Sequence, residues 1–178
     1  MYKGIVQSIL RGDIGKLDAL VAQGFDVHAV SEGDQWNLLH HALVSVSIAP
    51  VPEMIRRLID HGVDVNARDR YGNTPLHYAA RWKKPELIEM LLNAGAEVDP
   101  VNRDGLTPLR LMLTSKPYNL DAVATFLAHG ANPEQRAAGG ISVRDYARII
   151  GHDDHALIEL FDRYAPPNGD AGLAKGKA

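Results

Sequence analysis

The chain contains no cysteine. That absence excludes a disulfide framework, a thiolate metal site and a cysteine nucleophile, because each of them needs a sulfhydryl group. The sequence also lacks a run of about 18 apolar residues, the length that a membrane-spanning helix requires, and its first residues lack the small-residue cleavage site of a secretory signal. We therefore expect a cytoplasmic protein that does not enter a membrane.

An excess of charge of one sign is also missing. The 178 residues include 19 Lys and Arg and 22 Asp and Glu, so the formal net charge is only -3. A domain that binds the phosphates of nucleic acid usually has a clear basic excess, so this balance argues against such a partner. With 46% hydrophobic and 23% charged residues, the chain is expected to form one domain with a substantial core.

What the sequence does contain is a repeat. The pattern Gly-x-Thr-Pro-Leu at 72–76 recurs at 105–109, which is 33 residues later. Four apolar stretches each end in a glycine, which suits the left-handed backbone just beyond a helix end. These stretches are LVAQG, LIDHG, LLNAG and FLAHG, and they end at Gly24, Gly62, Gly95 and Gly130.

Another set of helices is predicted between these glycines. Thr74, Thr107 and Ser142 each stand before a helical pattern, and Asn37 does so in a further copy. Such side chains accept hydrogen bonds from the unpaired N–H groups of a first turn, and a proline at the next position suits that turn. The segment from Gly151 supplies one more second helix, so the sequence predicts five helix pairs.

This pattern resembles the ankyrin repeats, whose signature is T-P-L-H-x-A in a unit of about 33 residues. Residues 69–99 match most completely, and the resemblance covers roughly residues 2–165. The neighbouring units depart from the signature: Asn37 opens a copy without the Thr-Pro pair, Arg110 and Asp145 replace the histidine, and Tyr164 replaces the last glycine. Departures in outer units are expected, because a terminal unit must present a polar face to water.

The resemblance implies an all-α solenoid of about five helix-turn-helix units joined by β-turn fingers. We place the units at about 2–30, 31–66, 67–99, 100–134 and 135–165, as one ankyrin-repeat domain over 1–165. Residues 166–178 are rich in Pro, Gly and small residues, so we expect a disordered tail there. In this family the fingers and the first helix of each unit form a concave face.

Clusters of His and Asp raise the alternative of a metal-dependent hydrolase. His152, Asp153, Asp154 and His155 place two imidazole rings three residues apart, a spacing at which helix neighbours meet. The resemblance instead assigns Gly151 and His152 to the slot where the family carries Gly-His between its two helices. A structural role is favoured, so we predict no metal site and no cofactor, with the metal enzyme as a competing hypothesis.

No other motif supports catalysis. The resemblance places His40 and His77 at the signature position, in a buried hydrogen-bond network that ties a finger to its helix. Ser142 lies in GGISVRD, which lacks the second glycine of a nucleophile elbow, and its helix-cap position accounts for it. The sequence has no phosphate-binding glycine loop and no dinucleotide fingerprint. We therefore predict no catalytic residue and no enzyme activity.

A cluster of basic residues lies in the middle of the chain, interrupted by Asp69 and Asp104. A solvated face is the favoured interpretation, a patch for an acidic partner comes second, and nucleic acid is a distant third. The cluster consists of Arg68, Arg70, Arg81, Lys83, Lys84 and Arg103.

The resemblance also indicates where a partner would bind, because finger tips and the exposed faces of first helices do not build the repeat. Trp36 and Trp82, the two tryptophans of the chain, fall at such positions, and Trp, Tyr and Arg dominate binding hot spots. Local packing of Trp36 over its own helix stays open as the alternative. The predicted partner-binding residues are Asp34, Trp36, Arg70, Tyr71, Asn73, Arg81, Trp82, Arg103, Asp104, Leu106, Thr114 and Ser115, with Val44 and Ser45 at equivalent positions.

Two units are longer than the regular one between the signature and the closing glycine. The regular interval from Leu76 to Gly95 spans 19 residues, whereas 39–62 spans 23 and 109–130 spans 21. The extra residues fall in VSVSIAPVP and TSKPYN, the turns between the two helices of a unit. Such turns can widen the concave wall, but surface loops also lengthen by neutral drift at little thermodynamic cost.

We expect the protein to bind another protein through the concave face, by preorganised recognition. It resembles small free-standing ankyrin proteins of bacterial type, some of which are immunity proteins, so the specific hypothesis is an intracellular inhibitor of one toxin or enzyme that presents an acidic or apolar patch. This step rests on family analogy. A regulatory scaffold or adaptor is the alternative, a nucleic-acid binder is less favoured, and the unbound protein is expected to be a monomer.

Overall fold

The computed structural model describes residues 2–45, 48–137, 139–152 and 154–164. These residues contain ten helices and no strand apart from an isolated bridge between Arg136 and Ser142. The prediction of an all-α repeat is confirmed, whereas the predicted disordered tail lies outside the described residues. The helices are α1 (Tyr2–Arg11), α2 (Ile14–Ala22), α3 (Leu38–Val44), α4 (Pro52–Asp60), α5 (Pro75–Trp82), α6 (Pro85–Asn93), α7 (Pro108–Met112), α8 (Leu120–Ala128), α9 (Val143–Ile150) and α10 (His155–Arg163).

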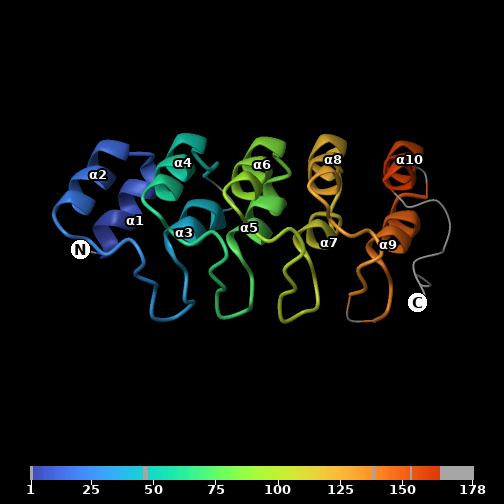
Figure 1. Ribbon diagram of the computed structural model, residues 1–178, viewed down its shortest axis with the longest axis horizontal. Coiled ribbons are helices and arrows are strands. Elements are labelled where there is room, and N and C mark those ends of the chain that lie inside the picture. The colour runs from blue at the N-terminus through green and yellow to red at the C-terminus, as the bar shows by residue number, and fades with distance from the viewer. Residues whose placement is uncertain (1, 46–47, 138, 153, 165–178) are drawn as a thin grey trace, which may run out of the picture.

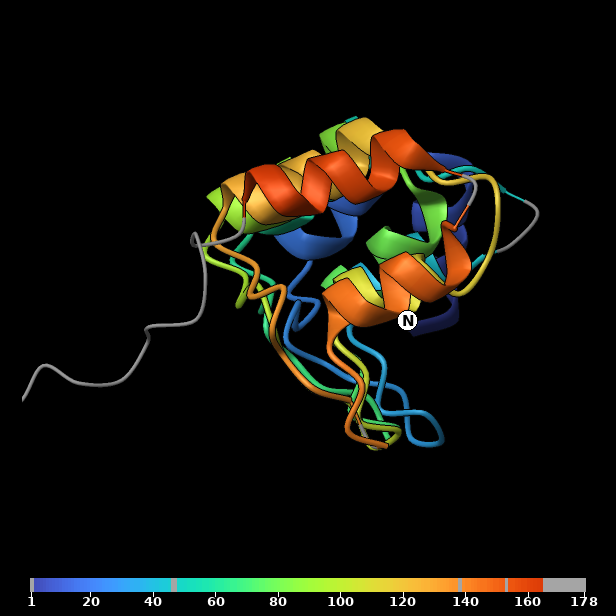
Figure 2. The same ribbon diagram turned by 90° about the vertical axis from the view of Figure 1, so that its right-hand side faces the viewer.

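The helices stack as pairs in two rows (Figure 1). The odd-numbered helices form an inner row, the even-numbered helices form an outer row, and the fingers all project from the inner side. Figure 2 looks along the stack and shows the fingers superimposed and turned away from the outer helices, so that fingers and inner helices meet at an angle. This angle produces the concave face that the resemblance implies.

The helix ends use the residues that the sequence indicated. Thr107 Oγ1 accepts a hydrogen bond from the backbone N–H of Arg110 (3.2 Å), and Ser142 Oγ accepts one from Asp145 (3.0 Å). Beyond α4, Gly62 adopts a φ of 80°, and its N–H donates to the carbonyl oxygen of Ile59 at 2.8 Å. A side chain at this φ would cost steric energy, which explains why glycine follows the helix.

Leucines join the two rows into a continuous core. Leu76 and Leu109 in the inner row and Leu58 and Leu91 in the outer row have no exposed surface. Truncating one such leucine to alanine typically costs about 2–5 kcal/mol, because apolar contact is lost and a cavity remains. The core therefore fixes the inner helices, and these position the concave face.

Two buried histidines connect the inner helices α3 and α5 to the finger of the next unit. Nε2 of His77 lies 3.1 Å from the carbonyl oxygen of Leu106, so Nε2 carries the proton, and Nδ1 accepts from the backbone N–H of Thr74 at 3.0 Å. His40 makes the equivalent contact with the carbonyl oxygen of Asn73 at 3.1 Å. The predicted structural role of His40 and His77 is thus confirmed.

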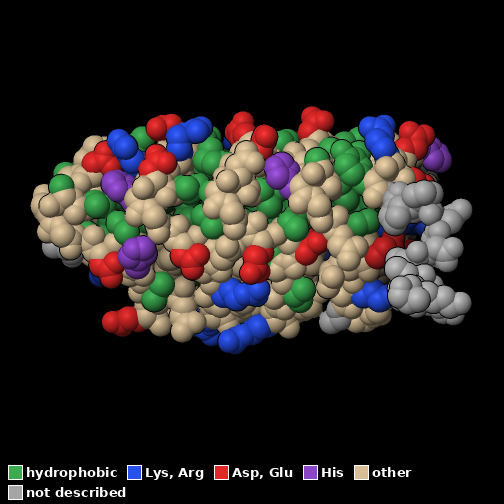
Figure 3. Space-filling view, viewed as in Figure 1, with side chains coloured by type: hydrophobic (Ala, Val, Ile, Leu, Met, Phe, Trp, Pro, Cys, Tyr) green, Lys and Arg blue, Asp and Glu red, His purple; other side chains and the backbone are tan. Residues whose placement is uncertain are grey.

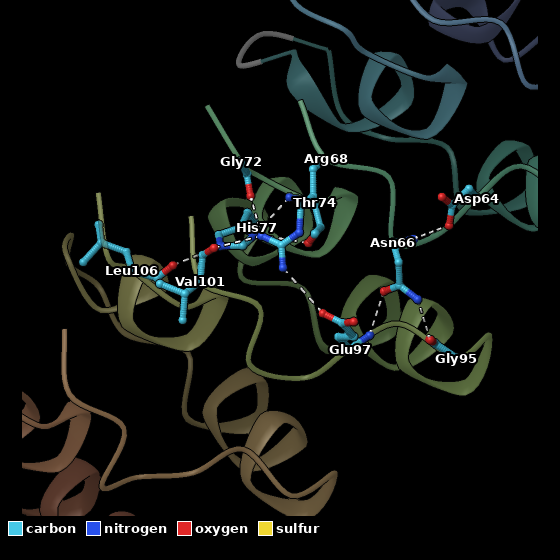
Figure 4. Close-up of polar contacts among 10 residues, drawn as sticks. All are labelled: Asp64, Asn66, Arg68, Gly72, Thr74, His77, Gly95, Glu97, Val101 and Leu106. Atoms are coloured by element: carbon cyan, nitrogen blue, oxygen red, sulfur yellow. Dashed lines mark hydrogen bonds and ion pairs between the residues drawn. The ribbon is translucent and has the colours of Figure 1, made fainter. Parts of the chain in front are cut away.

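Backbone and arginine contacts bind neighbouring fingers together. The N–H of Arg103 donates to the carbonyl oxygen of Tyr71 at 3.0 Å, and the N–H of Arg70 donates to that of Asp34 at 2.9 Å. Figure 4 shows the guanidinium of Arg68 between two fingers, where it donates to the carbonyl oxygens of Gly72 (3.3 Å) and Val101 (2.8 Å). The fingers therefore form one connected surface.

Candidate functional site

A groove of about 420 Å³ lies where the C-terminal ends of α3, α5 and α7 meet, at the edge of the concave face away from the fingers. We call it the helix-end groove. On the right of Figure 2 the turn from α7 to α8 bows outward beside these helix ends. The groove is lined by Leu43, Val44, Ser45, Arg81, Trp82, Lys83, Leu111, Met112, Thr114 and Ser115.

A second hollow of about 320 Å³ lies between α5, α7 and the fingers that precede them. We call it the finger hollow. It shares Arg81 and Leu111 with the helix-end groove, so the two adjoin along the concave face. The finger hollow is lined by Asn73, His77, Tyr78, Arg81, Asn102, Asp104 and Leu111.

The structure brings together some of the predicted partner-binding residues and separates others. Arg81, Trp82, Thr114 and Ser115 line the helix-end groove, together with Val44 and Ser45. Asn73 and Asp104 line the finger hollow with Arg81. The remaining predicted residues line neither hollow, and they are Asp34, Trp36, Arg70, Tyr71, Arg103 and Leu106.

Trp82 is a half-buried wall of the helix-end groove. Its Nε1 donates a hydrogen bond to the carbonyl oxygen of Leu43 at 2.9 Å, across to the preceding unit. The ring also packs against the core. Trp82 is therefore held in place before any partner arrives, and its role as an anchor for that partner stays a prediction.

Trp36 has a different environment. Its ring meets the edges of His41 and Tyr78, with centroid distances of 5.4 and 6.3 Å, and its Nε1 lies 3.4 Å from Oδ2 of Asp69. The hydroxyl of Tyr2 donates to the carbonyl oxygen of Trp36 at 3.1 Å. Trp36 thus packs between units, in line with the packing alternative, and its contact with a partner stays a prediction.

Asp69 is a buried residue whose importance the sequence did not reveal. Its carboxylate accepts hydrogen bonds from the hydroxyl of Tyr78 (2.6 Å) and from the backbone N–H groups of Tyr71 and Asn73 (2.8 Å each). Burial favours the neutral acid, but these hydrogen bonds outweigh it and hold the pKa of Asp69 below its ordinary value. The sequence offered one signal for this role. Asn102 stands 33 positions after Asp69, at the same place in the next unit, and its side chain accepts the equivalent hydrogen bonds from the backbone N–H groups of Asp104 and Leu106.

Half of the central basic cluster has a side-chain partner within the described residues, namely Arg68, Arg70 and Lys83. Arg70 lies 3.6 Å from the carboxylate of Asp34 and stacks on the ring of Tyr71 at 4.9 Å, and Arg68 connects the fingers. Figure 3 shows basic side chains at the lower edge of the molecule, over the central fingers. Arg81 differs, because it makes no hydrogen bond or ion pair with the described part of the chain and only lies 6.0 Å over the ring of Tyr78.

Lys83 holds the wall of the helix-end groove. It ends α5 in the left-handed conformation (φ 53°), and its Nζ donates to the carbonyl oxygens of Ser115 and Pro117, the latter at 2.9 Å. The side chain of Asn119 donates to the carbonyl oxygen of Lys83 at 2.9 Å. The inserted turn of the fourth unit is therefore fastened by the third, and it contributes Thr114 and Ser115 to the groove.

The segment from His152 to His155, considered above as a competing metal site, is described in part. Across residues 2–45, 48–137, 139–152 and 154–164, no three His, Asp or Glu side chains are placed to hold a metal ion. Asp154 caps α10 by accepting from the N–H of Leu157 at 3.1 Å, and Asp153 lies outside the described residues. In the same residues, no helix is both long and apolar enough to cross a membrane.

Comparison with known proteins agrees with the stacked helix pairs. The family model described as ankyrin repeats (3 copies) matches residues 5–102. An ankyrin repeat protein of fowlpox virus (strain NVSL) is 55% identical over 31 residues, which are 17% of this chain and 6% of the viral protein. The transient receptor potential cation channels V5 and V6 of Rattus norvegicus are 31% identical over 77 residues and 36% identical over 67.

These matches are partial on both sides. The channel segments cover 39% and 33% of this chain, and 11% and 9% of the V5 and V6 proteins. The chain thus spans about a tenth or less of the length of these relatives. The family match covers more than half of the chain, and the helix pairs continue beyond it to α10. The chain belongs to the ankyrin-repeat family, whose repeats form protein-interaction modules.

Proposed function

We propose that the protein is a cytoplasmic inhibitor of bacterial immunity type, which neutralises one toxin or enzyme by docking it on the concave face and performs no chemistry itself. The observation that carries the proposal is the fixed helix-end groove beside an unpaired Arg81. Trp82 and the inserted turn are already held by hydrogen bonds, so little conformational entropy is lost on docking.

The composition of this face suits a protein partner. Trp82 offers a large ring, and Arg81 offers a charged group that is not used elsewhere. Aromatic residues and arginine supply most hot spots, where truncation of one anchor costs about 2 kcal/mol or more. An inhibitor needs a single tight partner, and a rigid face of this kind favours tight binding over adaptable binding.

Affinity capture from a lysate of the source organism tests the proposal. We would compare the wild-type protein with Trp82→Phe and Arg81→Glu, and with Arg163→Glu on outer helix α10 as a control with the same change of charge. Circular dichroism would first show that all variants keep their helices. We expect one stoichiometric partner that wild type and Arg163→Glu retain, and that Arg81→Glu loses.

The activity of the captured partner then separates inhibition from other roles. Loss of that activity at a stoichiometric amount of this protein would support an inhibitor. An unchanged activity would contradict inhibition and favour a scaffold, and equal capture by all variants would place the interface elsewhere.

A scaffold or adaptor is the second candidate, and one observation favours it. A shallow hollow of about 500 Å³ lies on the outer row between α4 and α6, separate from the concave face. It is lined by Ile59 and Met90 together with the charged groups Arg56, Asp60, Glu86 and Glu89. Two partners captured at once, one lost with Arg81→Glu and the other with Met90→Glu, would establish this function.

A further inference from the structure

The helix-end groove has a charge of one sign. Arg81 and Lys83 are the charged side chains among the described residues that line it, and no Asp or Glu takes part. The acidic residue of the adjoining finger hollow, Asp104, makes no ion pair with Arg81. A ligand that enters this groove therefore meets positive charge that its walls do not neutralise.

The carbonyl groups around the groove could in principle attract a cation instead. The C-terminal ends of three helices converge here, and such ends carry partial negative charge. Trp82 Nε1 already binds the carbonyl oxygen of Leu43, and Nζ of Lys83 binds those of Ser115 and Pro117. Three carbonyl groups at the groove thus already have donors, whereas the donors of Arg81 have no acceptor within the described part of the chain.

Arg81 is placed to receive an anion. It lies in the last turn of α5, is exposed, and borders both hollows of the concave face. A guanidinium presents two parallel N–H groups that match the two oxygens of a carboxylate, and this bidentate geometry gives direction as well as attraction. A carboxylate over Arg81 would lie beside the apolar part of the groove.

That apolar part defines the rest of the ligand. Leu43 and Met112 are buried in its floor, and Val44, Leu111 and Trp82 are half exposed around them. An aliphatic or aromatic side chain that covers these groups would remove apolar surface from water on both partners. Neither a free anion nor a wholly acidic segment would use this surface.

We propose that the helix-end groove binds a protein segment in which an Asp or Glu stands next to an apolar residue, with the carboxylate on Arg81 and the apolar side chain against Trp82, Leu111 and Met112. Lys83 is a positioning residue in this site, because its amine is bound to the inserted turn that forms the wall. The inference rests on the proposed function, since it describes the part of the partner that docks on the concave face.

A random peptide library displayed on phage tests the inference with the full chain as target. We expect the selected peptides to pair an acidic residue with a Leu, Ile or Phe. A synthetic peptide of the selected sequence should bind Arg81→Ala about tenfold more weakly than wild type, as expected for a lost charged hydrogen bond, and should bind Arg163→Ala as tightly as wild type.

A double-mutant cycle locates the carboxylate. Changing the acidic residue of the peptide to its amide should weaken binding to wild type by the same factor and should have little effect on binding to Arg81→Ala. Because the chain has two tryptophans, their indole N–H signals provide an internal reference in an NMR titration: Trp82 should shift and Trp36 should not. Peptides without acidic residues, equal affinity for Arg81→Ala, or a shift confined to Trp36 would each overturn the inference.

The two proposals fail in different ways. If the partner captured from lysate is lost with Trp82→Phe but binds Arg81→Ala as tightly as wild type, the concave face is the interface and the carboxylate inference is wrong. If acidic peptides bind at Arg81 while the captured partner keeps its full activity, the inference holds and the inhibitor proposal is wrong.

Discussion

The joint between the third and fourth units differs from the joint between the fourth and fifth. In the former, His77 is satisfied at both ring nitrogens, by Thr74 and by the carbonyl oxygen of Leu106. In the latter, Arg110 takes the position of the histidine and stacks on the ring of Tyr146, and its buried Nε has no hydrogen-bond partner among the described residues. A buried polar group without a partner costs free energy, so the same position in the repeat gives a strong joint in one place and a weaker joint in the other.

This difference has a consequence for dynamics. Each unit of a solenoid is stabilised by its own interactions and by its contacts with its neighbours. A weaker joint therefore allows the fifth unit to open while the central units stay folded. The predictions below are ordered from the largest expected effect to the smallest.

Leu76→Ala should destabilise the third unit, which contributes to the stronger joint. The side chain is fully buried in α5, and its truncation should lower the free energy of unfolding by about 2–5 kcal/mol. Urea denaturation followed by circular dichroism measures this loss. Leu157→Ala in α10 is the matched control. In this variant the fifth unit should unfold first, in a separate transition at low urea. A single shared transition in both variants would contradict a weak joint between the fourth and fifth units.

Acidification should weaken the joint between the third and fourth units. Burial lowers the pKa of His77 to about 4, so the folded protein keeps this ring neutral while the unfolded chain binds a proton near pH 6.5. The free energy of unfolding should therefore fall as the pH drops from about 6.5 to about 4, and His77 should account for roughly 3 kcal/mol of that loss. Outside this pH window, the titration of His77 should change the free energy of unfolding little.

Denaturation curves across this pH range would show the effect. His77→Gln serves as the control, because a residue that does not titrate should remove this part of the slope. If the slope of that variant equals the slope of wild type, the histidine is not the group that responds to acid.

Arg110→His should strengthen the weaker joint, between the fourth and fifth units. Thr107 already caps α7 as Thr74 caps α5, so the new ring would have its first partner in place and would face the finger of the fifth unit. We expect about 1 kcal/mol of added stability in α9, the net contribution of one hydrogen bond. Slower amide hydrogen exchange in α9 would support this, whereas faster exchange would show that stacking on Tyr146 is the better joint.

Lys83→Met should have the smallest effect on stability. It removes the donors to the carbonyl oxygens of Ser115 and Pro117 at an exposed site, so we expect a change within about 1 kcal/mol. Amide exchange in the turn that joins α7 and α8 should nevertheless become faster, and exchange within α5 should not. Unchanged exchange in that turn would mean that Asn119 alone holds it.

The sequence predicted the fold because each unit carries its own local signals. Thr107 and Ser142 mark helix starts, and Gly62 marks a helix end, whatever lies next to them in space. The signature positions of His40 and His77 likewise predicted their buried hydrogen bonds. The helix caps depend on residues a few positions away, which a sequence pattern reports directly, whereas the contacts of the two histidines with Asn73 and Leu106 followed from the family signature.

The site was predicted less completely because its contacts join different units. The resemblance placed Trp36 and Trp82 at positions that do not build the repeat, but only the neighbouring units decide that Trp36 meets His41 and Tyr78 while Trp82 faces a groove. Asp69 looked like an interruption of a basic cluster, since its donors Tyr71 and Tyr78 are recognisable only once the finger is folded. The boundaries of the units and the complete set of partner-binding residues stay predictions.

The contact between Lys83 and the turn from α7 to α8 bears on how such proteins can be recombined. The third unit determines the shape of a loop that belongs to the fourth, because the amine that fastens Ser115 and Pro117 comes from α5's end. Grafting the fourth unit alone into another ankyrin protein would transfer its helices but not the conformation of this loop. The loop is therefore transplantable only as part of a pair of adjacent units, and the whole helix-end groove, which the ends of α3, α5 and α7 line, needs three.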